Sequence, residues 1–173
     1  MKIIEALKEL PLLEKRVQDV CVQLNTYASL ASSEEPALGT EDAHKKKVKE
    51  LKQKAIDLIR YYERLKNALE LTNCSIIVDI EGQKRTIREW ITVRMNTQRL
   101  YAVLFQSFNL NHANAILQQM RPDLNKEGTA VSLKRMYSDE EVNNERQQYE
   151  LMIGKIDSAL EVVNATTELV EKI

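Results

Sequence analysis

The sequence predicts a mainly α protein: an antiparallel bundle of three long helices plus a shorter helix, with a β-hairpin inserted at about residues 74–86. The 173 residues are 43% hydrophobic and 29% charged but include only four glycines and three prolines, a balance typical of long helices. Apolar residues recur at alternating spacings of three and four over most of the chain, which keeps one face of a helix against a partner. A single β-branched run in the middle interrupts that period.

A chain of this length buries enough surface to form a core without disulfides or metals, so we expect one domain over residues 1–173. The first predicted helix contains Pro11, which removes a backbone hydrogen bond, so we expect a bend near Leu7 or loosely attached first turns. A loop rich in Ser, Glu, Pro and Gly follows at residues 32–42. The predicted apolar stripe of this helix, with one polar member, is Ile3, Leu7, Leu10, Glu14, Val17, Cys21, Leu24, Ala28 and Ala31.

The second helix is predicted to begin after Thr40, whose hydroxyl can cap it, with Glu41 and Asp42 in its first turn. Its predicted stripe is Val48, Leu51, Ala55, Leu58, Tyr62, Leu65, Leu69 and Thr72. A possible basic patch lies at its start, formed by Lys45, Lys46, Lys47, Lys49, Lys52 and Lys54. Such a patch can bind phosphates or acidic lipid, but the neighbouring acids and the lack of interleaved aromatics favour a solvated helix face.

The stretch "SIIVDIEGQKRT" after Asn73 predicts a β-hairpin, because a β-branched run meets a Glu81-Gly82 turn and a short return strand. An isolated hairpin is marginal in water, and its edges can pair with another chain. We therefore expect the hairpin to be an oligomer interface. The residues predicted to form it are Ile76, Ile77, Val78, Ile80, Gly82 and Arg85.

The third helix is predicted from Ile87 to about Phe108, starting with a capping box of Thr86 and Glu89. It holds the only Trp and both Phe residues, so we expect it to be the densest part of the core. We expect a short helix near residues 113–120, a loop over residues 121–137 and a short strand at residues 129–137. A second capping box at Ser138 begins the last helix, whose predicted stripe to the terminus is Val142, Glu145, Tyr149, Met152, Ile156, Ala159, Val163, Thr166, Val170 and Ile173.

Catalytic motifs are absent from the sequence. His44 and His112 are the only histidines, and neither has a second ligand at the spacing that a metal site needs. The carboxylate pairs lie at predicted helix starts, where the helix dipole favours acids. We predict no catalytic residue, no metal, no cofactor and no enzymatic activity; for an unrecognised active site, Arg85, Arg94 and His112 are the first candidates.

Charge and hydropathy limit the partners. The net charge of −1 gives no global attraction to nucleic acid or an anionic membrane, which disfavours nucleic acid as a partner. No stretch approaches the ~18 apolar residues of a membrane span, and charges interrupt the N-terminal segment where a signal peptide would be continuous. Cys21 and Cys74 lack metal-site spacing, as is typical of reduced cytosolic thiols. We expect a cytoplasmic location, or a virion if the gene is phage-borne.

Several short motifs follow one another along the chain: "MKIIEALKEL…LEKRV", "EEP" at residues 34–36, "LI" at 58–59, "LTN" at 71–73, "RTIREW…R" at 85–94 and "IDSALEVVNATTEL" at 156–169. In this order they resemble the septicolysin-like family of small helical bacterial proteins. The resemblance covers nearly the whole chain and implies a self-associating helical bundle with a β-hairpin. Pro11, Tyr61-Tyr62 and the segment 109–128 depart from it, which leaves open a divergent member working in another setting, such as a bacteriophage particle.

These observations predict a non-enzymatic structural protein that forms a homo-oligomer through its helix stripes and hairpin. It would act as a cytosolic ring or as a component of a larger particle such as a phage virion, with other subunits of that particle as further partners. The alternative is a binding module that holds nucleic acid or an anionic surface through residues 45–54.

Overall fold

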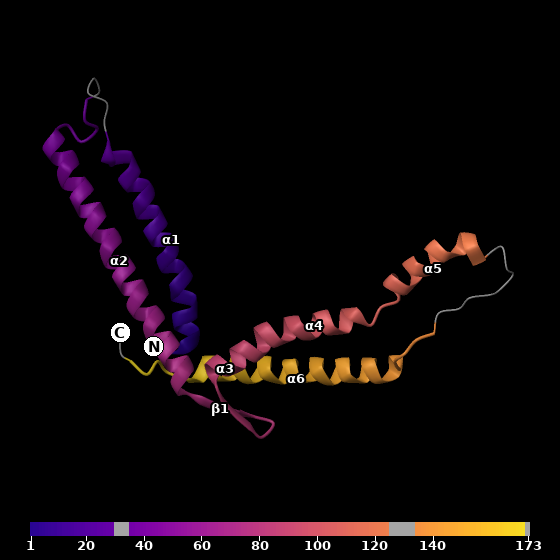
Figure 1. The fold of residues 1–173 in the computed structure, drawn as a ribbon. Helices are drawn as coiled ribbons and strands as arrows, with labels where there is room; N and C mark the ends of the chain where they lie inside the picture. The colour runs from indigo at the N-terminus through magenta and orange to yellow at the C-terminus, as the bar shows by residue number, and fades with distance from the viewer. Residues whose placement is uncertain (30–34, 125–133, 172–173) are drawn as a thin grey trace. The chain divides into compact units, whose positions relative to one another are not determined.

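The computed structural model describes residues 1–29, 35–124 and 134–171, and it confirms the predicted fold class. The chain is mainly α with an inserted two-stranded antiparallel hairpin (Figure 1). The elements in order are α1 (Ile3–Ala28), α2 (Glu41–Ser75), β1 (Ile77–Ile80), β2 (Gln83–Thr86), α3 (Ile87–Thr92), the π-helix η1 (Val93–Thr97), α4 (Gln98–Ser107), α5 (Asn111–Leu124) and α6 (Asp139–Thr166).

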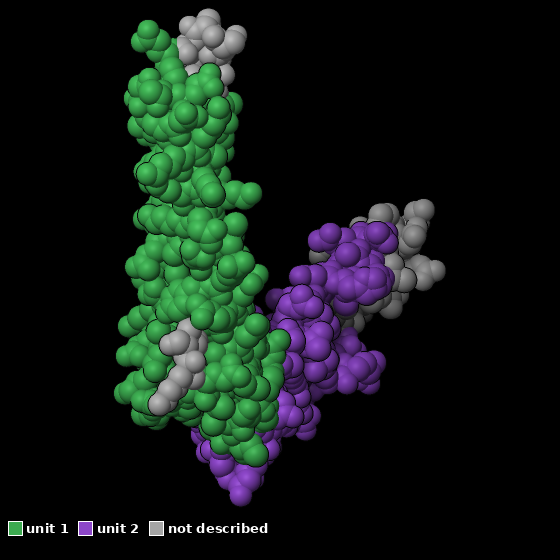
Figure 2. Space-filling model, turned by 90° about the vertical axis from the view of Figure 1, so that its left-hand side faces the viewer, with its two compact units in different colours: residues 1–78, 86–88, 160–173 green, residues 79–85, 89–159 purple. Residues whose placement is uncertain are grey.

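The chain forms two compact units, which Figure 2 colours separately. Unit 1 comprises residues 1–78, 86–88 and 160–173, and unit 2 comprises residues 79–85 and 89–159. We expected one domain over residues 1–173, whereas the internal contacts divide the chain in two. Both the hairpin and α6 contribute residues to each unit.

In unit 1, α1 and α2 lie side by side along their length (Figure 1). The predicted stripe of α2 is confirmed at Leu51, Ala55, Leu65, Leu69 and Thr72, which are all buried. Burying one such aliphatic side chain stabilises a fold by about 1.5–3 kcal/mol. Hydrophobic burial therefore holds this pair together, as the three-four spacing predicted.

The predicted stripe of α1 is wrong by one residue at every second position. The buried residues are Ile3, Ala6, Leu10, Leu13 and Val20, while Leu7 and Cys21 are exposed. Glu14, the polar residue of the predicted stripe, explains which face of α1 is buried, because burying its carboxylate without a charged partner is costly. Glu14 instead stays exposed and accepts a 2.8 Å hydrogen bond from the Tyr62 hydroxyl.

The first turns of α1 are anchored, so the alternative of a loosely attached start is wrong. The helix continues through Pro11 from its first to its last turn. The amide of Ile3 donates to the carbonyl oxygen of Thr167 at 3.0 Å, and the amide of Leu169 donates to that of Met1 at 2.9 Å. An antiparallel pairing of the two ends of the described chain therefore fixes α1 at its beginning.

The stripe of the last helix predicted that this helix reaches the terminus. This prediction is wrong, because α6 ends at Thr166. The following residues are extended and make the pairing with the N-terminus. The amide of Val170 also donates to the buried hydroxyl of Thr72 on α2 at 3.0 Å. At Leu169 and Val170 these hydrogen bonds replace the helical ones that a longer α6 would have made.

The predicted third helix is a contiguous run of α3, η1 and α4, all helical but not one regular helix. Trp90 and Phe105 are buried as expected, whereas Leu104 is 48% exposed. A π-helical segment inserts an extra residue into the helical repeat, which turns the residues after it to other faces. The prediction that this helix is the densest part of the core therefore fails for α4, where Phe105 is the one buried residue among the ten described.

In unit 2, α4 packs against α6 through aromatic and charged side chains. The rings of Tyr101 and Tyr149 stack with centroids 4.0 Å apart. The Arg146 guanidinium lies 5.5 Å from the Phe105 ring centroid. These contacts join α4 to α6, two helices that α5 separates in the sequence.

The remaining loop predictions are partly corrected. The expected short helix is confirmed as α5, but it extends to Leu124, so the loop predicted at residues 121–137 begins inside a helix. Most of the strand predicted at residues 129–137 lies outside the described residues. The loop at residues 32–42 is described from residue 35, and α2 begins at Glu41 as predicted.

Candidate interaction surfaces

The β-hairpin closes through a tight turn at Glu81 and Gly82. Both residues have positive φ, 55° and 78°, as the type I′ turn that matches strand twist requires. Glycine adopts this conformation without strain. The amide of Gly82 also donates to Asp79 Oδ1 at 2.9 Å. Gly82, predicted as an interface residue, therefore has a structural role in shaping the turn.

The predicted interface residues of β1 lie on opposite faces of the strand, as alternation requires. Ile77 is 66% exposed, whereas Ile80 is 5% exposed and belongs to the core. Ile76 and Val78 are half-buried. The interface role predicted for Ile80 is therefore corrected, because its own chain covers that side chain. Ile77 is the residue of β1 that presents a large apolar side chain outward.

Arg85, the last predicted interface residue, packs on an aromatic ring of its own unit. Its guanidinium lies 5.0 Å from the centroid of the Trp90 ring and donates to Gln83 Oε1 at 3.2 Å. A cation over a Trp face is stabilised by the ring quadrupole. At the tip, Lys155 Nζ lies 3.0 Å from Glu81 Oε1, so an ion pair attaches the hairpin turn to α6 within unit 2.

The six lysines of the possible basic patch do not gather on one face of α2. Lys45, Lys49 and Lys52 share a face through their four- and three-residue spacing. Lys46, Lys47 and Lys54 point to other faces, and Lys47 is half-buried. The positive charge is therefore spread around the helix.

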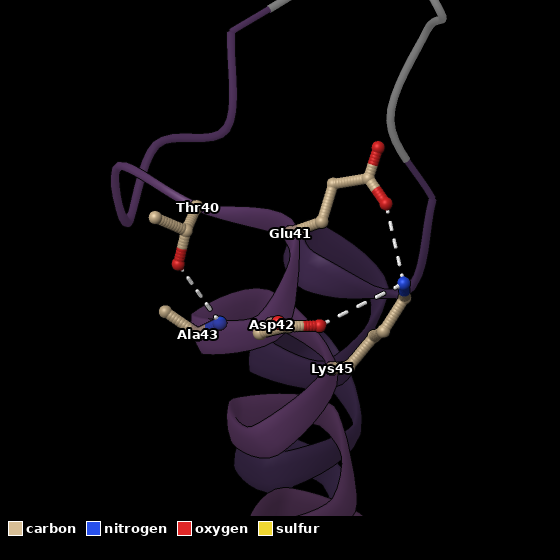
Figure 3. Close-up of polar contacts among 5 residues, drawn as sticks. All are labelled: Thr40, Glu41, Asp42, Ala43 and Lys45. Carbon is tan, nitrogen blue, oxygen red and sulfur yellow. Dashed lines mark hydrogen bonds and ion pairs between the residues drawn. The ribbon is translucent and has the colours of Figure 1, made fainter.

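Acidic residues at the start of α2 further reduce this charge (Figure 3). The Thr40 hydroxyl accepts from the Ala43 amide at 3.2 Å, which caps the helix as predicted. Lys45 Nζ lies 3.2 Å from Glu41 Oε2 and 4.0 Å from Asp42 Oδ1. These carboxylates compete with any phosphate for Lys45.

His44 is buried, although Lys45 and Lys46 beside it are exposed. Its ring meets the Tyr27 ring edge to face, with centroids 5.5 Å apart. Its Nε2 is buried and has no hydrogen-bond partner among the described residues. The side chain lies in the contact between α1 and α2 because its position on α2 turns it toward Tyr27.

The residues named for an unrecognised active site have separate surroundings. Arg94 Nη1 lies 3.5 Å from Asp157 Oδ1 on α6, Arg85 lies on Trp90, and His112 is exposed in the first turn of α5. Within the described ranges, no group of three or more His, Cys, Asp or Glu side chains could hold a metal ion. The helices of the described chain include none that is long and apolar enough to cross a membrane.

Sequence reasoning missed a gap between α4 and α6 in unit 2. A cavity of about 380 Å³ opens there, and the Tyr149 hydroxyl beside it is buried without a hydrogen-bond partner among the described residues. Burial raises the pKa of Tyr149 above its usual value. The cavity is lined by Gln98, Ala102, Phe105, Gln106, Arg146, Tyr149, Glu150 and Ile153. Helices α4 and α6 therefore do not close completely on each other.

Sequence reasoning also missed an apolar surface on α4, which we call the α4 stripe. It consists of Leu100, Val103 and Leu104, which are 62%, 59% and 48% exposed. Their three- and four-residue spacings place them on one side of the helix. Tyr101 and Phe105, which contact residues of α6, lie on another side. Residues 100–105 are apolar without interruption, so a helix formed by them has apolar side chains on more than one side. This run is the sequence signal that would have revealed the α4 stripe.

Comparisons with protein-family models, curated proteins and solved structures found no match to this chain. The resemblance to the septicolysin-like family therefore stays a prediction.

Proposed function

We propose that this chain is a non-enzymatic structural protein that assembles into a homo-oligomer. The supporting observation is that unit 2 exposes more large apolar side chains than it buries, counted over its described residues. The exposed ones are Met95, Leu100, Tyr101, Val103, Leu104, Ile116, Met136 and Leu151. The buried ones are Ile80, Trp90, Phe105, Val142, Ile153 and Ile156.

This imbalance favours association because covering apolar surface stabilises a complex by about 25 cal/mol per Å². Single exposed apolar residues are ordinary, but contiguous ones typically mark interaction sites. A second copy is the partner that is always present at the chain's own concentration. Closed symmetric homo-oligomers are also the commonest assemblies of soluble proteins.

The hairpin supports the same proposal. In the described part of the chain, its sheet holds only β1 and β2, and strand edges are where another chain can add a strand. Ile77 supplies an outward apolar side chain beside that edge. The assembly would be a cytosolic ring or part of a larger particle such as a phage virion, and the family resemblance leads to the same expectation of self-association.

Size-exclusion chromatography with light scattering tests the proposal across micromolar concentrations. We expect a mass that is a multiple of the 20.0 kDa chain. A mass of one chain at every concentration contradicts it. Among the described residues no contact favours the alternative of a binding module, which can be tested on the same protein preparation. Oligonucleotide binding that falls with salt and is lost when Lys45, Lys46 and Lys47 are replaced by Glu would support that alternative.

A further inference from the structure

The hairpin and α6 enclose an open groove, which we call the hairpin groove. Its volume is about 920 Å³, and its lining residues belong to unit 2. No described residue of α4 lines it, so it is distinct from the cavity between α4 and α6. The residues that determine its shape and charge include Asp79, Glu81, Glu150, Leu151, Gly154 and Ser158.

Small residues of α6 leave room in the hairpin groove. Gly154 has no side chain, and a Cβ atom built there would meet no heavy atom within 4 Å outside its own stretch of helix. Ser158 lies one turn further along the same side of α6. Leu151, one turn before Gly154, is 67% exposed and offers an apolar surface beside this space. A protruding apolar side chain from another molecule therefore fits between Leu151 and Ser158.

The hairpin groove and the α4 stripe lie on sides of their helices that face away from the α4–α6 contact. Tyr149 lines the cavity against α4, and because each residue turns a helix by about 100°, Leu151 lies about 200° around α6 from it. Val103 of the α4 stripe lies about 200° around α4 from Phe105, which contacts Arg146 of α6. A symmetric contact through either surface alone would leave the other uncovered. A contact between the α4 stripe of one copy and the hairpin groove of another covers both.

The charges of the two surfaces are complementary. The groove is lined by the carboxylates of Asp79, Glu81 and Glu150 and by the ammonium group of Lys155. Lys155 Nζ lies 3.0 Å from Glu81 Oε1, so Asp79 and Glu150 give the groove an excess of negative charge. Arg99 is the only charged residue of α4, and among the described helices of ten or more residues α4 alone contains no Asp or Glu. Charge complementarity therefore favours α4 over the other long helices as the occupant of the groove.

The two surfaces also match in length. Helix α4 has ten residues and is therefore about 15 Å long. The part of α6 that lines the groove, from Gln147 to Ala159, extends about 18 Å. Arg99 lies on the same side of α4 as the stripe, because Val103 follows it by four residues. The stripe and the arginine can thus contact the groove together.

We propose that the α4 stripe of one copy docks in the hairpin groove of the next copy, so that the chains associate head to tail. Contacts of this kind are heterologous, and they close into a ring or continue as a filament according to the rotation between neighbours. This inference rests on the proposed self-association and names the two surfaces that mediate it. Because α4 is short, each contact is smaller than the ~800 Å² per partner of a standard interface, and we expect association that depends on concentration.

The first test fills the hairpin groove by Gly154→Leu in the full chain. The added side chain enters free space and raises the helix propensity of α6, so the helical circular dichroism should match that of the wild type. Light scattering should show that assembly needs a concentration about tenfold higher or more. The matched control is Gly154→Ala, which also raises the helix propensity, adds only one methyl group and should assemble as the wild type does.

The second test mixes two variants that each have one damaged surface. Gly154→Leu keeps an intact α4 stripe, and the double variant Leu100→Asp and Val103→Asp keeps an intact hairpin groove. Both replaced side chains of the double variant are exposed, so its helical circular dichroism should also be retained. The mixture is measured at the highest concentration at which each variant alone is monomeric. One intact stripe then meets one intact groove, so light scattering should show the mass of two chains and no larger species.

The outcomes separate this contact from self-association in general. A monomeric wild-type chain overturns both proposals. A wild-type assembly that Gly154→Leu leaves intact, or an equimolar mixture that stays monomeric, overturns the contact between the α4 stripe and the hairpin groove and leaves self-association standing. If the double variant does not fold, the comparison of Gly154→Leu with Gly154→Ala decides alone.

Discussion

The two helix pairs in this chain differ in how far their apolar side chains are buried against each other. In unit 1, α1 and α2 bury an aliphatic stripe along most of their length, including Leu10, Leu13, Leu51 and Leu65. In unit 2, α4 and α6 meet through stacked tyrosines and an arginine over a phenylalanine, beside a cavity. The first pair buries a continuous aliphatic stripe, although Leu7 and Val22 of α1 stay exposed, whereas Phe105 is the only buried residue among the ten described residues of α4.

The difference lies in where the apolar residues stand relative to the partner helix. The α2 stripe follows one face for its whole length, so one partner is enough. Apolar residues of α4 occupy two faces, and one partner covers only one of them. The number of apolar faces, and not the number of apolar residues, therefore indicates whether a helix needs a second partner.

The largest expected effect is in the core of unit 1. Replacing the fully buried Leu65 by Ala should lower the free energy of unfolding by about 2–5 kcal/mol, because it leaves a cavity between α1 and α2. Urea denaturation followed by circular dichroism measures the loss. The matched variant Leu100→Ala should change the stability of the monomeric chain by less than about 0.5 kcal/mol. Equal losses for both variants would remove the distinction between the two pairs.

The hairpin provides the next comparison, between two isoleucines on one strand. Ile80→Thr places a hydroxyl in the core and should cost about 1–3 kcal/mol of stability without a direct effect on assembly. Ile77→Thr should leave the stability of the monomer nearly unchanged and weaken assembly if hairpins pair between copies. Thermal unfolding and light scattering on both variants separate these effects. A loss of stability from Ile77→Thr equal to that from Ile80→Thr would contradict the assigned faces.

A smaller effect is expected at the start of α2. Thr40→Ala removes the side-chain acceptor for the Ala43 amide and should cost about 1 kcal/mol. Thr40→Ser keeps the hydroxyl and serves as the control. The α1–α2 pair should unfold at lower urea concentration only in the Ala variant, and equal midpoints for Ala and Ser would show that the cap contributes nothing.

The smallest effect is expected for Tyr62→Phe. The hydrogen bond to Glu14 raises the pKa of Tyr62 above its usual value of 10.0, with smaller contributions from burial and from the Glu14 charge. The stabilisation is therefore present below pH 10 and is lost as pH rises through the higher pKa of the folded state. Melting temperatures of the two proteins should differ slightly at pH 7 and converge in strong alkali. A difference that persists there would rule out the hydrogen bond as its cause.

The regular parts of the fold follow from the sequence because short-range chemistry determines them. Thr40 caps α2, Glu81-Gly82 turns the hairpin, and the α2 stripe identifies the buried face. The stripe of α1 was misplaced because Leu7 and Ala6 are equally consistent with the spacing, and only the cost of burying Glu14 decides between them. The π-helix η1 and the pairing of Ile3 with Thr167 depend on contacts between distant segments, which no local pattern reveals.

The candidate surfaces were less predictable for the same reason. Strand alternation places Ile77 and Ile80 on opposite faces, but which face is covered depends on segments that are distant in the sequence. His44 and its lysine neighbours differ in exposure only because α1 covers one side of α2. The α4 stripe was missed because the third helix was predicted to be the densest part of the core, and the sequence does not show how many helices surround α4.

Hydrogen–deuterium exchange at several protein concentrations tests the central claim most directly. The account predicts that amide protection of α4, residues 98–107, increases as the concentration rises through the association range, while protection of the α1–α2 pair stays constant. Protection of α4 that is the same at all concentrations, in a chain whose mass remains that of a monomer, would contradict it.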